Sequence, residues 1–469
     1  MKSTYVWQTL MLLGLMAFSC EKSEECPDVE EDNIPRIEIG EPTLNVAADA
    51  KSGKFFYIVK NPIKGVTSTA VSDVEWIHDI SVGGGIVSFG IDQNNDIERI
   101  GNIHMAYSDV ASADVTIVQA ASEEELSVYS SDLHFQFEGE SRVIKGYSSR
   151  KWTLTGTTDW AKTDVTSGEA GYFTLNIDVM ENVSKAEDRR TDFIFHLNNS
   201  KKTFRLSVSQ DKDSRPENPS DSDPSNTKFY RKILLTDFCG TDDIYTPIMQ
   251  KTLMEVLHYP EYSKKAVLAS AHMYNLDDPA YFNSTLASAM EIKGYPTLIA
   301  NLNKMNKMYA NAGLTDVQQF IDDAGSSETL AGVAANSAVI YDCLYVNSSV
   351  KSAIPKLKNF RVAVWILEDG IYGKQKNALD ESYNIHDNCV RAISGDSDDY
   401  HGVATNPVAL AMREVGNASF KIELNSSWDK SKLRYLVVVS AQNKDGFYEV
   451  CNVDSARLGE SIQYNYSEP

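Results

Sequence analysis

The stretch from Arg231 to Leu257, RKILLTDFCGTDDIYTPIMQKTLMEVL, decides the fold of the second half of the chain. Its apolar run Ile233–Leu235 predicts a short buried strand of a parallel or mixed sheet. A polar loop follows. Thr246 and Pro247 then predict a helix start, because threonine can cap a helix and proline suits the first helical position. One face of that helix is apolar and consists of Met249, Leu253, Val256 and Leu257.

A second signal lies downstream, in Gly294–Thr297, which reads Gly-Tyr-Pro-Thr. A strand, a loop and a capped helix followed by Tyr-Pro-Thr resemble the thioredoxin fold. In that family the loop carries Cys-x-x-Cys at the helix start, and the later proline is cis and faces it. The resemblance implies that Pro296 is the cis-proline and that Asp243 and Thr246 stand at the two cysteine positions.

Cys239, Asp243 and Thr246, here called the degenerate redox loop, lack the groups that dithiol chemistry needs. That chemistry requires a thiolate whose pKa is lowered by the helix N-terminus and a resolving thiol within reach. Cys239 lies four residues before Asp243, the first of the two expected cysteine positions, and the loop has no second cysteine. We therefore predict no catalytic residues and no enzyme activity. The alternative is a protein related to thiol–disulfide oxidoreductases with residual activity through Cys239 alone.

The charge balance excludes one class of partner. The chain has 469 residues, enough for several domains, and a net charge of -22 from 44 basic and 66 acidic residues. Nucleic-acid binding needs a basic stripe along the phosphate backbone, and the sequence has none. Metal-ligand spacing among the cysteines and cofactor motifs are also missing, so we expect no metal and no cofactor.

The N-terminal segment predicts export. Residues 1–19 combine Lys2 with an apolar core too short for a membrane span, which is typical of a signal peptide. Cys20 follows a small residue and resembles a bacterial lipobox cysteine, so we predict lipid attachment there and an acidic tether over 20–36. The alternative is an ordinary secretory signal with a chance cysteine. The lipoprotein prediction implies an outer-membrane location, on either the periplasmic or the surface face.

Residues 37–121 and 122–211 predict two β-sandwiches related by an internal repeat. Leu126–Val128 parallels Leu44–Val46, and Phe204–Gln210 parallels Asp114–Gln119. Trp160 likewise parallels Trp76. These features resemble the BACON family, an immunoglobulin-like module of Bacteroidetes. The resemblance implies binding of glycans or mucin-like material, or mere spacing of the next domain from the membrane.

Trp76 and Trp160 are weak carbohydrate-binding candidates, because aromatic faces pack against sugar rings. Packing in the core or at a strand edge is the competing interpretation. Neither repeat shows the surrounding amides and carboxylates of a lectin site.

Residues 212–228 are rich in proline, serine and acidic side chains and predict a disordered linker. Beyond it we expect a thioredoxin-like domain over 229–335 and a C-terminal β-sandwich over 336–469. This half resembles the outer membrane protein 28 family of Bacteroidetes-type lipoproteins. The matching positions are Phe238, Gly240, Pro247, His272, Asp278, Pro279, Tyr295, Pro296, Thr297 and the segment His386–Ala392.

One pair of side chains and one further histidine in this half could carry chemistry but have a structural alternative. His386 and Cys389 could form a nucleophile–base pair, and His272 could act as a general base. No orienting partner is evident in the sequence, so we expect all three to be packing residues. Apart from Cys20, an odd number of cysteines remains, and pairing among Cys26, Cys239, Cys343, Cys389 and Cys451 stays open.

The predicted fold class is therefore multidomain: two immunoglobulin-like β-sandwiches, an α/β thioredoxin-like domain and a C-terminal β-sandwich. The predicted function is a non-catalytic outer-membrane or cell-surface lipoprotein that acts as a binding platform. Glycans and an outer-membrane protein are the candidate partners, beside the membrane itself. Besides the single-cysteine oxidoreductase, a pure structural spacer is the remaining alternative.

Overall fold

The structure, a computed structural model, describes residues 34–310, 312–395 and 400–467. The chain divides into two compact units, Met1–Lys212 and Asp213–Pro469, and strands dominate both. No helix among these residues is long and apolar enough to cross a membrane. The predicted signal peptide, Cys20 and Cys26 lie outside the described residues.

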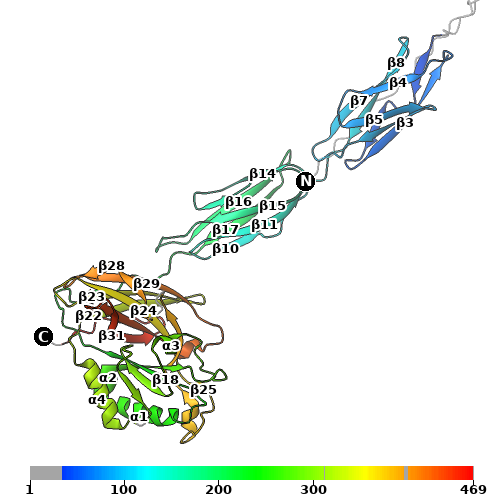
Figure 1. Ribbon diagram of the computed structural model, residues 1–469. Coiled ribbons are helices and arrows are strands. Elements are labelled where there is room, and N and C mark those ends of the chain that lie inside the picture. The colour runs from blue at the N-terminus through cyan, green and yellow to red at the C-terminus, as the bar shows by residue number, and fades with distance from the viewer. Residues whose placement is uncertain (1–33, 311, 396–399, 468–469) are drawn as a thin grey trace, which may run out of the picture. The chain divides into compact units, whose positions relative to one another are not determined.

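The first β-sandwich has two sheets (Figure 1). Side chains along their strands alternate between more buried and more exposed positions. One sheet has the order β1 (Arg36–Ile39), β3 (Ser52–Lys60), β6 (Ile86–Ile91), β5 (Ile77–Gly83). The other has the order β2 (Thr43–Val46), β8 (Ala111–Gln119), β7 (Arg99–Tyr107), β4 (Ser68–Ser72). Phe55, Val87, Ile103, Val115 and Ile117 form the core between them.

The second β-sandwich repeats this strand order. Its first sheet runs β9 (Leu126–Val128), β11 (Glu140–Ser148), β15 (Gly171–Val179), β13 (Ala161–Thr163). Its other sheet runs β10 (Asp132–Phe135), β17 (Thr203–Gln210), β16 (Arg189–Leu197), β12 (Trp152–Thr155), β14 (Ser167–Gly168). In both copies the short second strand pairs in parallel with the last long one, β2 with β8 and β10 with β17. The internal repeat is present at the level of topology, but the predicted match of Leu126–Val128 with Leu44–Val46 is wrong. β9 occupies the place of β1, and β10 is the strand that matches β2.

The unit from Asp213 onward is built on one continuous 12-stranded sheet. Its order is β21 (Lys307–Tyr309), β20 (Thr297–Ala300), β18 (Ile233–Cys239), β19 (Ala266–His272), β27 (Cys389–Ser394), β24 (Lys358–Glu368), β28 (Val403–Leu410), β29 (Val415–Glu423), β23 (Cys343–Ser352), β22 (Ala331–Ile340). β30 (Leu433–Gln442) joins β24 to β31 (Tyr448–Arg457). The predicted boundary near residue 335 therefore does not separate two compact bodies, because β19 pairs with β27 from the C-terminal part.

Helices cover one face of the sheet at β18. These are α1 (Thr246–His258), α2 (Pro260–Lys265) and α4 (Leu314–Gly325), which lie beside β18 in Figure 1, whereas α3 (Leu286–Ala289) packs on the opposite face. The remaining elements are β25 (Ile371–Tyr372), β26 (Ile385–His386), η1 (Glu381–Asn384) and η2 (Lys430–Lys432). Leu235, Met249, Leu253, Val317 and Ile321 fill the space under α1 and α4. The apolar stripe expected of α1 thus faces the core, with Leu257 only partly buried.

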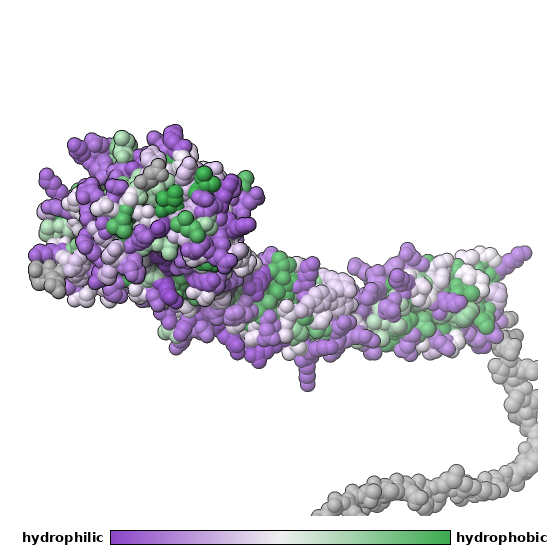
Figure 2. Space-filling view, turned by 90° about the horizontal axis from the view of Figure 1, so that it is seen from below, coloured by the Kyte–Doolittle hydropathy of each residue, from purple (hydrophilic) through white to green (hydrophobic). Residues whose placement is uncertain are grey.

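The prediction of a disordered linker over 212–228 is corrected by the structure of residues 213–228. The segment has no helix or strand, as its composition predicts, yet it is tied to the sandwich strands of its own unit. The ammonium group of Lys351, a fully buried side chain, donates to Asp221 Oδ2 at 2.7 Å and to the Asp223 carbonyl at 2.9 Å. The face of this unit that Figure 2 shows is mostly hydrophilic with separate apolar spots.

Candidate functional site

The candidate site lies where the parallel strands β18 and β19 end, facing α1. Along this face of β18, the apolar side chains Ile233 and Leu235 give way to Asp237 and Cys239. On β19 the change is from Ala266 to Ser270 and His272, two residues that pair with Asp237 and Cys239. Carboxyl ends of parallel strands are the usual place for a site in such sheets.

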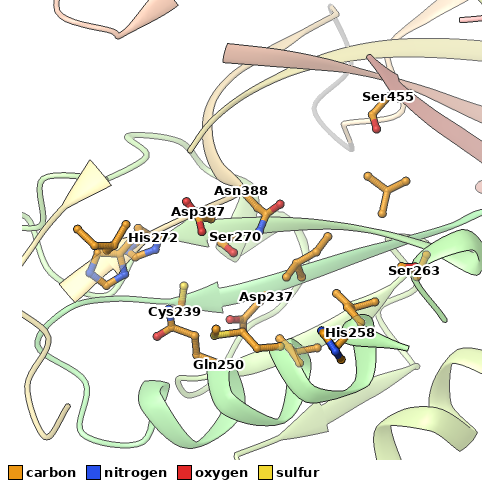
Figure 3. A pocket seen from close by; sticks show the side chains of 18 of the residues that line it. Asp237, Cys239, Gln250, His258, Ser263, Ser270, His272, Asp387, Asn388 and Ser455 are labelled. Carbon is orange, nitrogen blue, oxygen red and sulfur yellow. The ribbon is translucent and has the colours of Figure 1, made fainter. Parts of the chain in front are cut away.

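A cavity of about 680 Å³ opens between these strand ends and α1. Figure 3 shows Asp237 and Gln250 in its centre, with Ser270, Asp387 and Asn388 across from them. Its apolar wall comes from helix α1, through Leu253, Met254 and Leu257. Its size falls within the range of small-molecule sites.

Asp237 is the unusual residue of this cavity. Its side chain is buried, with the residue 3% exposed, and its Oδ1 atom has no hydrogen-bond partner among the described residues. Burial raises the pKa of Asp237 to about 7, and the Asp243 carboxylate adds to the rise, while a hydrogen bond with the Cys239 thiol opposes it. Gln250 Oε1, in the same cavity, also has no partner among the described residues.

Asp278 organises the loop beside the cavity. One of its oxygens accepts hydrogen bonds from His272 Nδ1 and from the Thr241 backbone N–H, both at 2.8 Å. Burial alone would raise the pKa of Asp278, but the His272 contact and the backbone donors lower it to about 2. The structure therefore supplies the orienting partner for His272 that the sequence does not reveal.

His386 comes from the C-terminal part and lies against His272, with ring centroids 4.9 Å apart in an edge-on arrangement. Its Nε2 donates to the Gly373 carbonyl at 2.9 Å. Burial lowers the pKa of His386, and the neighbouring His272 lowers it further. Gln375 reaches the same loop and donates to the carbonyls of Thr241 and Asp243. Residues 371–386, which we call the strap, thus cover the degenerate redox loop.

The two positions expected to replace the cysteines bond to each other. Asp243 Oδ2 accepts from the Thr246 backbone N–H at 2.7 Å and from its hydroxyl at 2.8 Å. Thr246 is therefore the first helical residue and not the cap that its sequence position suggests. Asp243 takes the capping role, because its carboxylate accepts both the backbone N–H and the hydroxyl of the first helical residue.

The thiols of this region are sequestered. Cys239 is 2% exposed, and burial raises the pKa of its thiol well above the ordinary value, as does the nearby Asp237. Cys389 is also buried and its pKa is raised, first by burial. Neither forms a disulfide, nor do Cys343 and Cys451. Cys239 and Cys389 lie on strands separated by β19, roughly 10 Å apart at two strand spacings, which is too far for a disulfide.

Pro296 precedes β20, and the Tyr295–Pro296 peptide bond is cis. The Tyr295 ring packs edge-on against Tyr274, which follows β19, at 5.4 Å. The proline is fully covered by its neighbours, so its role in this chain is structural support at the strand start.

The weak carbohydrate-binding candidates are packing residues. The Arg99 guanidinium lies 4.5 Å over the Trp76 ring, and Arg189 lies 4.7 Å over Trp160. Each indole also packs against the core of its own sandwich. Each arginine then bonds the buried glutamine that ends its sandwich: Arg99 bonds Gln119 at 2.8 Å and Arg189 bonds Gln210 at 2.7 Å. Neither indole offers the free ring face that sugar stacking needs.

Sequence reasoning missed Asp237, Gln250 and the strap. One signal for Asp237 is available, since a carboxylate interrupts the otherwise apolar strand Ile233–Cys239. Nothing in the sequence places Gln250 or His386 beside Asp237. Gln250 comes from helix α1, and His386 comes from strand β26, more than a hundred residues downstream. Among the described residues, no group of three His, Cys, Asp or Glu side chains is placed to hold a metal ion.

Comparison with known proteins yields only weak likenesses. No protein-family model matches the chain, and no curated protein matches it. HBP35 of Porphyromonas gingivalis is 15% identical with a TM-score of 0.40, over 51% of this chain and 79% of that one. The adhesin InvE of Yersinia pseudotuberculosis is 8% identical with a TM-score of 0.25, over 40% of this chain and 65% of the adhesin. A Bacteroides ovatus GH5 xyloglucanase, solved in complex with an XXXG heptasaccharide, is 12% identical with a TM-score of 0.18, over 43% of this chain and 44% of the enzyme. Scores this low carry no argument about fold or activity.

Proposed function

We propose that the protein is a non-catalytic binding protein whose ligand site is the cavity between α1 and the ends of β18 and β19. The observation that carries this proposal is the combination of a preformed cavity of about 680 Å³ with a buried, unpartnered Asp237 oxygen inside it. A buried polar atom without a partner costs stability, so a fold that keeps one in a cavity has a use for it.

Thiol–disulfide exchange fits this site poorly. Exchange begins with attack by a thiolate, and burial keeps the Cys239 thiol protonated and out of contact with solvent. No second cysteine of the described part of the chain forms a disulfide with Cys239, and Asp243 and Thr246 are committed to each other. The thioredoxin-like arrangement of β18, α1, β19 and the cis-proline strand is in this proposal a scaffold that was kept for binding.

The two sandwiches act in this proposal as spacers that hold the binding unit away from a lipid anchor at Cys20. Their indoles are covered by arginines, which supports spacing over glycan binding. An outer-membrane or cell-surface location follows from the predicted anchor and belongs to the same proposal.

A ligand screen with a blocked cavity tests the proposal. The chain from Glu21 onward, which keeps both compact units, is exposed to arrays of glycans and of small metabolites. The matched variants are Ser270→Phe, which fills the cavity from β19, and Ser112→Phe, which places the same ring on an exposed position of β8. We expect ligands that bind the wild type and Ser112→Phe but not Ser270→Phe. Ligands retained by Ser270→Phe, or insulin reduction above the uncatalysed rate by the wild type, would contradict the proposal.

A further inference from the structure

The cavity presents two acceptors without donors where β18 faces α1. Asp237 Oδ1 and Gln250 Oε1 both line it, and neither has a hydrogen-bond partner among the described residues. They come from β18 and α1, which face each other across the cavity (Figure 3). A ligand that enters must therefore bring hydrogen-bond donors to satisfy them.

The charge around Asp237 is negative. The charged group that acts on it is the Asp243 carboxylate, and no described basic side chain does so. The other titratable groups facing it are the Cys239 thiol on β18, His272 on β19 and the Cys389 thiol on β27. His272 is already bonded to Asp278 at 2.8 Å, so it does not neutralise Asp237.

The basic side chains farther along the cavity are also committed or distant. Lys232 pairs with Asp454 at 2.6 Å. Arg434 bonds Asn388 and faces Asp369, whose Oδ2 lies 3.7 Å from its Nε, although that Nε has no hydrogen-bond partner among the described residues. His258 ends α1, two helical turns beyond Gln250, which is about 12 Å at the usual rise per residue. Asp237 thus lacks a counter-ion from the described part of the chain.

We propose that this cavity takes a small organic cation, a primary amine or an amidinium with an apolar body, and that the Asp237 carboxylate is its counter-ion. The Gln250 carbonyl accepts a second N–H of the same group. The apolar body then lies against Leu253, Met254 and Leu257 on α1. This inference rests on the proposed function, because it names the ligand class of the same cavity.

A cationic ligand favours ionised Asp237, which makes binding dependent on pH. Because the pKa of Asp237 is about 7 in the free protein, the ionised fraction falls about tenfold between pH 8 and pH 6. Amine affinity should fall by the same factor over that interval, since the amine itself stays charged. The affinity of a neutral hydroxylic ligand should not fall in this way between pH 8 and pH 6.

The test is calorimetric titration of the chain from Glu21 onward with 2-phenylethylamine, its neutral analogue 2-phenylethanol and its anionic analogue 3-phenylpropanoate. We expect the amine to bind the wild type at least tenfold more tightly than either analogue. Asp237→Asn keeps the shape and removes the charge, and should lose at least tenfold in amine affinity. Asp242→Asn is the matched control, because Asp242 is exposed, pairs with Lys376 and is not among the residues that line the cavity. Its affinity should stay within twofold.

Three results would overturn the inference: equal amine binding by Asp237→Asn, equal binding of the neutral analogue, or no amine binding at concentrations up to about 10 mM. Thermal unfolding of each variant verifies that a loss of binding is not a loss of fold. The same experiments distinguish a failure of this inference from a failure of the proposed function. A hydroxylic ligand blocked by Ser270→Phe but indifferent to Asp237→Asn would keep the cavity as the binding site and remove the cation from it.

Discussion

Asp243 and Thr246 are joined by two hydrogen bonds, of 2.7 and 2.8 Å, across the start of helix α1. These are the two positions at which the thioredoxin fold, by resemblance, has its cysteines. A carboxylate that accepts from the first turn stabilises a helix start, whereas a thiolate pair there would carry redox chemistry. The loop is therefore built for rigidity beside the cavity.

Asp243→Ala should destabilise the protein by about 1–2 kcal/mol, because it removes a helix cap and leaves the buried Thr246 hydroxyl without its acceptor. Urea denaturation of wild type and variant measures this change. Asp242→Ala is the control: its carboxylate is exposed and pairs with exposed Lys376, so its effect should stay below about 0.5 kcal/mol. Equal effects of the two substitutions would contradict the capping role.

Asp237→Asn should become increasingly stable relative to the wild type as the pH rises. The carboxyl titrates near 3.8 in the unfolded chain and near 7 in the fold, so the folded state holds the proton more tightly. Stability contributed by the protonated form is complete below pH 3.8 and is lost as the pH rises to 7. The difference should grow between pH 4 and 7, level off above it, and reach up to about 4 kcal/mol. Denaturation midpoints that differ by the same amount at pH 5 and pH 8 would argue against a buried, unpaired carboxyl.

His386→Gln should become more stable relative to the wild type as the pH falls, which is the opposite of the trend for Asp237→Asn. Burial lowers the pKa of His386 below 6.5, so the fold favours the neutral ring, and the wild type loses stability as the pH falls below 6.5. Glutamine keeps an N–H donor for the Gly373 carbonyl but takes up no proton. Between pH 7 and pH 5 the variant should lose less stability than the wild type. Parallel pH profiles would show that His386 is not buried as described.

Lys351→Met should release residues 221–223 of the segment 213–228, while Asn336 and Asn347 still bond its Glu217 and Pro216 carbonyls. The buried ammonium group holds Asp221 and the Asp223 carbonyl, and it also lies 3.0 Å from the Tyr466 hydroxyl. Breaking a buried pair of this kind costs about 3 kcal/mol. Hydrogen exchange of residues 221–223 should accelerate by at least tenfold. Lys228→Met, an exposed lysine in the same segment, provides the control and should leave the exchange unchanged.

Cys239 should resist alkylation in the native protein. Its buried, protonated thiol reacts slowly until the chain unfolds. Incubation with iodoacetamide at neutral pH, followed by mass spectrometry, should leave Cys239 unmodified while the partly exposed Cys343 is labelled. Rapid labelling of Cys239 would restore the single-cysteine oxidoreductase as an alternative.

Local sequence patterns predicted the elements well where neighbours in sequence decide the structure. The alternating strands of both sandwiches, the apolar stripe of α1 and the Tyr-Pro-Thr turn are of this kind, because periodicity and proline geometry act over a few residues. The paired placement of Gln119 and Gln210 in the two repeats likewise follows from matching strand ends.

Features that depend on distant segments could not be predicted in this way. Residues 213–228 look disordered by composition, and side chains more than a hundred residues away hold them: Asn336, Asn347, Lys351 and Tyr466. The junction of β19 with β27 also depends on one long-range pair, Ser270 with Cys389. The cavity itself exists only where Asp237 and Gln250 meet across two elements, and no spacing in the sequence encodes that meeting.

A crystallographic fragment screen on the chain from Glu21 onward tests the central claim most directly, since it locates ligands without assuming their class. The account predicts that fragments bind in the cavity lined by Asp237, Gln250 and Ser270, with a donor group within hydrogen-bond distance of Asp237. A cavity that stays empty while fragments collect on the sandwiches, at Trp76 or Trp160, would contradict it.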